Sequence, residues 1–324
     1  MRSSMTRFRR DLIKRFWAYQ QNAYPDWERY SDARGPSSRP PVFRKDAASH
    51  NVLVSPGADC EAHQNILSMI NLSARHRWFG SMNSSQALAQ SVLGNLAVGD
   101  HLGCLREVQS DEGLPILANA PISSSNLSME HQVHCLGEPR PTELDAHLHL
   151  AGGYQIAIEC KFTEAEMGTC SRPRLTPKHA NFGRDYCDGS YRRQGARQAR
   201  CSLAARGVLY WRYTPEVFTW RGDQDHDGCP LRRNYQLVRN VLAVAVCDDG
   251  RVDLGQGHVL LIYDERNPAF GVNGEAYRSY CETRQALHCD EMLRKCSWQR
   301  IIRAMRRQGI LSWLTEQLAL KYGL

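Results

Sequence analysis

The sequence has no long hydrophobic run. Across its 324 residues no apolar segment reaches the roughly 18 residues that a membrane-spanning helix requires. No apolar core of a secretory signal follows the basic N-terminus. These absences predict a cytoplasmic protein that does not contact membranes. Hydrophobic content of 42% and charged content of 23% are typical of a globular chain, long enough for one large domain or two.

Closely spaced cysteine pairs are also missing. The chain has 12 cysteines but no Cys-x-x-Cys pair, and without an export signal a disulfide framework is not expected. Four cysteines lie close together in the sequence, mostly near loops: Cys170, Cys187, Cys201 and Cys229. Such a group could bind Zn²⁺ or an iron–sulfur cluster. Buried free thiols are the alternative.

Acidic residues are absent from two stretches, 189–215 and 294–315, in a chain of net charge +7. The first stretch interleaves arginines with tyrosine and tryptophan, and its first four arginines are Arg192, Arg193, Arg197 and Arg200. Basic and aromatic residues in alternation suit nucleic acid, because they bind backbone phosphates and stack on bases. The stretch therefore predicts nucleic-acid contact. Solvated helix faces are the alternative.

Two alternating runs flank a Gly-containing break at 151–153, and this pattern predicts a β-hairpin. A three-residue loop, in which glycine supplies the left-handed conformation, leaves only apolar residues on one face. The other face then carries Asp145 opposite Glu159, and Lys161 follows on the same face. Because a one-residue slip would reverse the faces, the register is well specified.

Two carboxylates and an ammonium on one face could serve phosphodiester chemistry. Mg²⁺ or Mn²⁺ takes oxygen ligands, polarises a phosphoryl oxygen and lowers the pKa of a bound water. Lys161 could orient that water or stabilise developing charge. A salt-bridged polar face is the alternative interpretation. Another is a metal site formed by Asp145 with His147 and His149 at alternate positions of one strand.

The spacing from Asp145 to the sequence Glu159-Cys160-Lys161 resembles the motif of the PD-(D/E)XK superfamily of restriction-endonuclease-like nucleases. The resemblance implies that Asp145 and Glu159 ligate the metal, with the Cys160 backbone carbonyl as a third ligand. It also implies that Lys161 is catalytic. The first half of the motif departs from the family pattern, because the nearest proline is Pro141.

The order of expected elements matches the αβββαβ core of that superfamily. The elements are a helix at 84–96, a strand at 127–136, the hairpin at 143–162, a helix at 232–246 and a strand at 258–263. We therefore expect an α/β, restriction-endonuclease-like core with a mixed sheet at 81–270, containing a cysteine-bearing insertion at about 165–230. A helix and loop-rich extension at 1–80 and a helical segment at 271–324 are the expected additions.

Three further polar residues could assist the proposed metal site. The helix that precedes the sheet in the superfamily often supplies an acid, but helix 84–96 has none, and Gln86 is a polar candidate there. Glu130 on the first strand and Gln236 on the helix at 232–246 are the other candidates. For Gln86, a surface role is the alternative.

Together these features predict a Mg²⁺-dependent deoxyribonuclease of restriction or repair type, with DNA as its partner and RNA as an open alternative. A different class of function also stays open. It is a catalytically inactive nucleic-acid-binding protein with a structural metal site, which the missing acid on helix 84–96 slightly favours.

Overall fold

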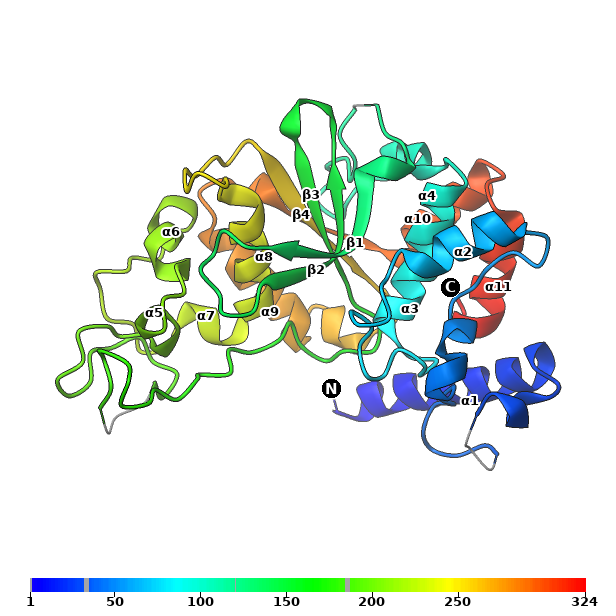
Figure 1. Ribbon diagram of the computed structural model, residues 1–324, viewed down its shortest axis with the longest axis horizontal. Helices are drawn as coiled ribbons and strands as arrows, with labels where there is room; N and C mark the ends of the chain where they lie inside the picture. Colours follow the sequence, from blue (N-terminus) through cyan, green and yellow to red (C-terminus); the bar gives the residue numbers. More distant parts are fainter. Residues whose placement is uncertain (1, 32–34, 120, 184–186) are drawn as a thin grey trace.

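The centre of the molecule is a mixed β-sheet. The computed structural model describes residues 2–31, 35–119, 121–183 and 187–324. In this part of the chain five strands form one sheet in sequence order; β1, β2 and β3 are antiparallel, and β3, β4 and β5 are parallel. Their bounds are β1 (Leu127–Val133), β2 (Thr142–His149), β3 (Gln155–Cys160), β4 (Gly257–Tyr263) and β5 (Leu293–Ser297). Figure 1 shows helices on both sides of the sheet, which confirms the predicted α/β fold.

The β2–β3 hairpin has the predicted register. Ala146 pairs with Ile158, as a three-residue loop requires. The loop itself is 151–153, and within it Gly152 and Gly153 have φ angles of 81° and 83°. Glycine adopts this left-handed conformation without the steric cost of a Cβ atom. The break between the two alternating runs is therefore what fixes their alignment.

Helices cover both faces of the sheet. One face packs against α1 (Arg2–Ala23), α2 (Cys60–Ser68), α3 (Ser85–Ala89), α4 (Asn95–Val98), α10 (Trp298–Arg307) and α11 (Ser312–Tyr322). The other packs against α6 (Tyr210–Val217), α7 (Pro230–Arg233), α8 (Tyr235–Ala245) and α9 (Glu275–Ala286). Ile158 belongs to the first core, and its neighbour Ala157 belongs to the second. The polar side of the hairpin is therefore no open surface, because α8 lies over it (Figure 1).

The helix predicted at 84–96 is present in three parts. The Ser84 hydroxyl caps it by accepting a hydrogen bond from the Ala87 N–H at 3.2 Å. A π-helical segment, Gln90–Gly94, then joins α3 to α4. The N-terminal amphipathic helix is also present as α1. Its apolar residues Leu12 and Phe16 are buried in the first core, so this helix docks on the protein body.

The segment 271–324 contains the helices α9, α10 and α11 and, in addition, a fifth strand, β5, that was not predicted. The strand is hard to recognise in the sequence because Arg294 and Lys295 occupy its middle, a pattern not typical of a buried strand. Both side chains are buried, and polar partners compensate the cost of burying their charges. The Arg294 guanidinium donates to two backbone carbonyls, and the Lys295 ammonium pairs with Asp111. The segment ends with the two helices α10 and α11.

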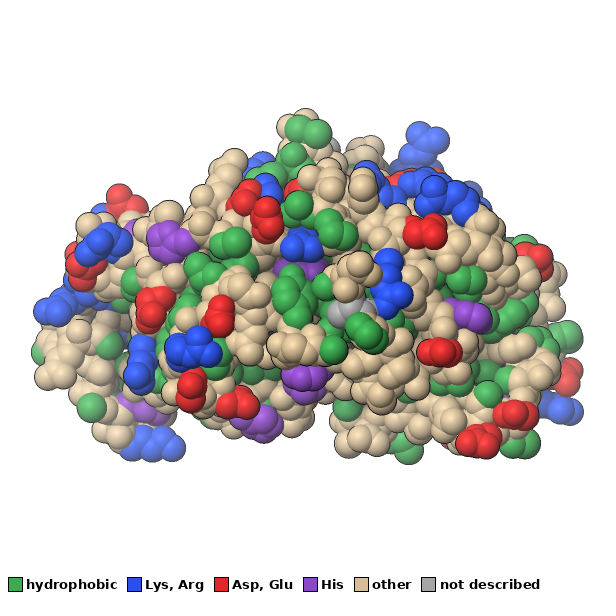
Figure 2. Space-filling view, turned by 90° about the horizontal axis from the view of Figure 1, so that it is seen from above, with side chains coloured by type: hydrophobic (Ala, Val, Ile, Leu, Met, Phe, Trp, Pro, Cys, Tyr) green, Lys and Arg blue, Asp and Glu red, His purple; other side chains and the backbone are tan. Residues whose placement is uncertain are grey.

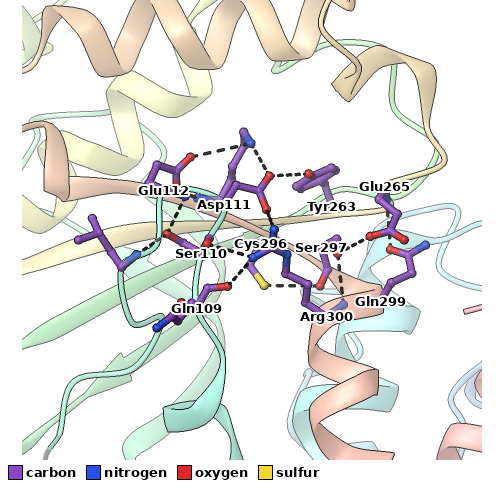
Figure 3. A network of polar contacts seen from close by, with 12 residues as sticks. Gln109, Ser110, Asp111, Glu112, Tyr263, Glu265, Cys296, Ser297, Gln299 and Arg300 are labelled. Carbon is purple, nitrogen blue, oxygen red and sulfur yellow. Dashed lines mark hydrogen bonds and ion pairs between the residues drawn. The ribbon is translucent and has the colours of Figure 1, made fainter.

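Figure 3 shows the polar network around Asp111, the residue with which Lys295 forms its ion pair. Asp111 accepts a hydrogen bond from the Tyr263 hydroxyl at 2.7 Å and lies 3.3 Å from the Arg300 guanidinium. The adjacent Glu112 lies 3.9 Å from the Lys295 ammonium. These contacts tie the loop before β1 to the far edge of the sheet, where β4, β5 and α10 meet.

Between β3 and α5 (Ser202–Ala205) the described residues form no helix or strand. Short 3₁₀ helices occur at Trp27–Arg29, Lys45–Asn51, Leu102–Glu107, Ser124–Asn126, Pro268–Phe270 and Asp290–Met292. Among the described residues, no helix combines the length and apolar character that crossing a membrane needs.

Candidate active site

The sheet places three acidic residues side by side. Glu130 is on β1, Asp145 on β2 and Glu159 on β3. The adjacent row is paired across the same three strands and consists of Met129, Ala146 and Ile158. The three acids are the immediate neighbours of these paired residues: Glu130 of Met129, Asp145 of Ala146 and Glu159 of Ile158. They therefore form the next row across the same three strands. Carboxylates in neighbouring strands lie close enough to act on one another.

Glu159 is the most enclosed of these acids, with 1% of its surface exposed. Helix α8 supplies two amides to it: Gln236 Nε2 donates to Oε1 at 2.7 Å, and Asn240 Nδ2 donates to Oε2 at 2.8 Å. The Lys161 ammonium lies 2.9 Å from Oε1. Such partners are needed because burial without them disfavours a charged carboxylate. Beyond these contacts Oε2 keeps a second acceptor position.

Lys161 sits within this acidic group rather than at its edge. Its ammonium donates to Gln236 Oε1 at 2.8 Å in addition to the ion pair with Glu159. Burial by itself lowers the pKa of Lys161, but the negative charges of Glu159, Glu164 and Asp145 outweigh burial and raise the pKa. The side chain is therefore a fixed positive charge at neutral pH.

Asp145 is held by the neighbouring strand. The Cys160 backbone N–H donates to Asp145 Oδ2 at 2.7 Å. Burial raises the pKa of Asp145 well above its ordinary value, and the charges of Glu159 and Glu130 add to that effect, whereas Lys161 opposes it. The carboxyl thus lies where an additional positive charge would be strongly favoured.

Glu130 has two unusual features. Its φ angle is 51°, a left-handed conformation that costs free energy for a residue with a side chain. Burial raises its pKa to about 7; the Gln86 amide opposes the rise, and the charges of Glu143 and Glu159 add to it. Among the described residues its buried Oε1 has no hydrogen-bond partner. A buried carboxylate oxygen without a hydrogen-bond donor would be stabilised by a bound cation.

Gln86 borders this group but is engaged elsewhere. Its Nε2 donates to the Ala74 carbonyl at 3.1 Å, and its Oε1 accepts from the His76 N–H at 2.9 Å. These bonds fasten the loop at 74–76 to α3. Gln86 therefore interacts with the site through Glu130, and none of its described hydrogen bonds involves Glu159.

His147 and His149 do not gather around Asp145. The His147 Nε2 lies 3.0 Å from Gln155 Oε1, and its ring stacks on that of His131 with 4.2 Å between centroids. Burial lowers the pKa of His147 to about 4, so the ring is neutral at physiological pH. His149 is exposed at the strand end. This geometry gives no support to the interpretation as an Asp–His metal site.

Two residues of the site were missed from sequence. Asn240 bonds Glu159, and its position one helical turn after Gln236 on α8 is a signal that could have found it. Glu164 accepts from the Ser85 hydroxyl at 2.8 Å and from the Phe162 N–H at 2.6 Å. Its charge acts on Lys161 from the turn after β3.

The predicted nucleic-acid-binding arginines differ in their surroundings. Arg197 is buried, and its guanidinium donates to Gln194 and Ser202. Arg192 and Arg200 form ion pairs with aspartates of the loop at 221–230. Arg193 is exposed.

One family of proteins matches the sequence over most of its length. The family is REase-ARP, described as "Restriction Endonuclease associating with ARP", and its sequence model matches residues 19–323. The chain belongs to the REase-ARP family. Comparison with curated proteins and with solved structures gives no match. Membership of REase-ARP agrees with the predicted relationship to restriction-endonuclease-like nucleases.

The donor set of this REase-ARP protein fits a hard divalent cation. Glu130 offers a buried oxygen without a donor, and Glu159 Oε2 keeps an acceptor position. Carboxylate oxygens are the ligands that Mg²⁺ and Mn²⁺ prefer. Within the described residues, no group of three or more His, Cys, Asp or Glu side chains is already arranged around a common point. The Lys161 ammonium stands among the carboxylates and balances part of their charge.

Proposed function

We propose that this REase-ARP protein is a metal-dependent nuclease that hydrolyses phosphodiester bonds of DNA. The observation that carries the proposal is the row of Glu130, Asp145 and Glu159 across three strands, with Lys161 beside it. Three acids on one row, one of them buried and two half-buried, repel one another and cost stability, so a purely structural role explains them poorly. Membership of a restriction-endonuclease family supports the same conclusion.

The carboxylates of Asp145 and Glu159 would hold Mg²⁺ or Mn²⁺, with the Cys160 carbonyl as a third ligand, and Glu130 lies where it can add an oxygen. The bound cation supplies polarisation of a phosphoryl oxygen and a water of lowered pKa. Asn240 and Gln236 fix the Glu159 carboxylate from α8, which limits the directions in which its oxygens can point.

Lys161 acts as a charge and a donor rather than as a base. Because its pKa is raised, it holds its proton at neutral pH and cannot accept one from water. Its ammonium can instead donate to a phosphate oxygen or to the attacking water, and it can stabilise charge that develops on the phosphate. Gln236 sets the position of that ammonium.

Backbone contacts with DNA would come from local basic positions. On the face seen in Figure 2, Lys and Arg side chains are interspersed with Asp and Glu, so that face presents no continuous basic surface. Two members of the predicted set are exposed: Arg193, and Arg192, which forms an ion pair with Asp227. A few phosphate contacts of this kind would give moderate, salt-sensitive affinity.

The test compares parent protein with Asp145→Asn, Glu159→Gln and Lys161→Met on duplex DNA, single-stranded DNA and RNA, each with Mg²⁺, with Mn²⁺ and with EDTA. The parent should cleave DNA only when a divalent cation is present. Each variant should lose activity by a factor on the order of 100 or more. Glu216→Gln, an exposed acid on α6, is the matched control and should cleave as the parent does. Equal cleavage by parent and Asp145→Asn would place the active site elsewhere.

A nucleic-acid-binding protein without turnover is the second candidate. The close ion pair between Lys161 and Glu159 favours it, because a lysine that neutralises the acid can replace a cation permanently. This candidate predicts that the parent retards DNA in a binding assay and yet cleaves neither DNA nor RNA with any divalent cation. Cleavage that disappears in Lys161→Met excludes it.

A further inference from the structure

The insertion between β3 and α8 holds four thiols that the proposed active site does not use. Cys170, Cys187, Cys201 and Cys229 are all free; Cys201 is buried and the other three are half-buried. The described chain from the end of β3 to α5 has no helix or strand. A long irregular segment packed on a domain needs some other source of order.

Backbone hydrogen bonds bring three of the four cysteine segments to one place. The Cys170 N–H donates to the Arg232 carbonyl at 2.9 Å, and Arg232 is three residues beyond Cys229. The Cys229 N–H donates to the Gly189 carbonyl at 2.8 Å, and Gly189 is two residues beyond Cys187. The segments that carry Cys170, Cys187 and Cys229 are thus hydrogen-bonded to one another at or near their cysteines.

Cys201 belongs to the same neighbourhood. Arg200, the residue before Cys201, donates to Asp225 Oδ1 at 2.6 Å and to the Gly222 carbonyl at 3.3 Å, and both acceptors lie in the loop that carries Cys229. Cys201 is buried in the second core, and Cys229 packs against the same core. The segment of the fourth cysteine is therefore joined to the other three.

A backbone N–H group faces one of the sulfur atoms. The Arg172 N–H donates to Cys170 Sγ at 3.4 Å. A donor of this kind stabilises a thiolate rather than a thiol, and the thiolate is the form that binds a metal.

We propose that Cys170, Cys187, Cys201 and Cys229 bind one Zn²⁺ ion as a four-thiolate structural site that fixes the insertion on the core. Zn²⁺ with four cysteine ligands is a common structural centre in loop-rich segments. On binding, the four thiols release four protons to solvent and the four sulfur atoms each donate an electron pair to the ion. In the described residues no three of these side chains already surround a common point, so binding of the ion requires them to move together.

The site also has a consequence for α8. Gly168, two residues before Cys170, lies against Gln236, with 3.3 Å between an ideal Cβ at the glycine and Gln236 Oε1. An ion that holds Cys170 thereby holds the chain that packs on Gln236. The zinc centre is separate from the nuclease reaction, and its presence or absence is measured without any activity assay.

The experiment purifies the full chain without chelators and measures its metal content by elemental mass spectrometry. About one zinc per chain is expected, with zinc–sulfur distances near 2.3 Å in X-ray absorption. Cys201→Ser and Cys229→Ser should lose the zinc, whereas Cys60→Ser, at an exposed thiol, and Cys281→Ser, at a half-buried one, should keep it. Circular dichroism checks that each variant is folded. If Cys201→Ser, at a buried thiol, does not fold, Cys187→Ser replaces it.

Three results would overturn the proposal. The first is a parent protein with zinc far below one ion per chain, even after refolding with added Zn²⁺. The second is iron and sulfide with visible absorption, which would assign the same thiols to an iron–sulfur cluster. The third is zinc that stays bound in Cys201→Ser, Cys229→Ser and Cys187→Ser, which would place the ion at another site.

Discussion

Lys161 and Gln236 are joined by a hydrogen bond of 2.8 Å, from the lysine ammonium to the glutamine side-chain oxygen. The same glutamine donates from its amide nitrogen to Glu159 at 2.7 Å. Its oxygen thus faces the positive charge and its NH₂ group faces the negative one, which is the only amide orientation that satisfies both. One side chain of α8 therefore positions both members of the catalytic pair that we propose.

Replacing Gln236 by leucine should lower nuclease activity about 10- to 100-fold, as is usual when a partner of a metal ligand is lost. The side chain is half-buried, so the fold should persist. Cleavage rates at several Mn²⁺ concentrations measure the effect, because a displaced Glu159 should also raise the Mn²⁺ requirement. Gln285→Leu, at an exposed position of α9, is the control. Equal loss in both variants would point to general damage to the fold.

Glu130→Gln should make the protein more stable and bind its metal less well. The substitution removes a half-buried carboxylate whose buried Oε1 has no donor in the described structure and which is repelled by Glu143 and Glu159. Relief of such a group is worth on the order of 1–3 kcal/mol. Urea unfolding and Mn²⁺ titration calorimetry measure the two effects. Glu143→Gln, whose acid is paired with Arg140, is the comparison. Undiminished Mn²⁺ affinity in Glu130→Gln would remove Glu130 from the site.

The Lys295–Asp111 pair offers a test of how β5 is held. Asp111→Ala leaves the Lys295 ammonium largely buried with only the more distant Glu112 for balance. Loss of one partner of such a pair costs about 3–5 kcal/mol. The double variant Asp111→Ala/Lys295→Met should regain much of that loss, because no unpaired charge remains. Unfolding in urea measures each variant, and Asp253→Ala, from an exposed pair, should change stability little. Strictly additive losses would disprove the coupling.

The part of the site that could be predicted from sequence is local to one hairpin. Alternation on both sides of 151–153 permits only one register that keeps one face apolar, and that register sets Asp145 and Glu159 on adjacent strands. Nothing beyond neighbouring residues was needed. The helix at 84–96 was predictable for a similar reason, because Ser84 caps it and its apolar residues recur at helical spacing.

The rest of the site depends on contacts between distant segments. Asn240 reaches Glu159 across 81 positions of sequence, and a lone asparagine on an apolar helix carries no sign of its partner. Glu130 enters the row because β1 pairs with β2, and its left-handed conformation cannot be read from its identity. β5 is hidden for the same reason: its central Arg294 and Lys295 are compatible with burial only once their partners are known.

Lys321 should make stability depend on pH above neutrality. It is fully buried on α11, and its ammonium donates to the Asn51 carbonyl at 2.6 Å and to Asn51 Oδ1 at 2.8 Å. Burial lowers its pKa from 10.5 to about 7. Between these values the unfolded chain carries a proton that the folded chain has released, so stability rises as the pH rises. Below about pH 7 both states are protonated and the whole cost of the buried charge is present.

The measurement is urea unfolding of the parent, Lys321→Met and Lys14→Met at intervals from pH 6 to pH 10. The parent should gain up to about 1.4 kcal/mol per pH unit above pH 7 relative to Lys321→Met, since one titrating proton sets that maximum slope. Lys14 is exposed on α1, so Lys14→Met should follow the parent. A Lys321→Met protein whose stability changes with pH as the parent's does would show that Lys321 keeps its charge in the folded state. The two Asn51 oxygens would then stabilise the buried ammonium fully.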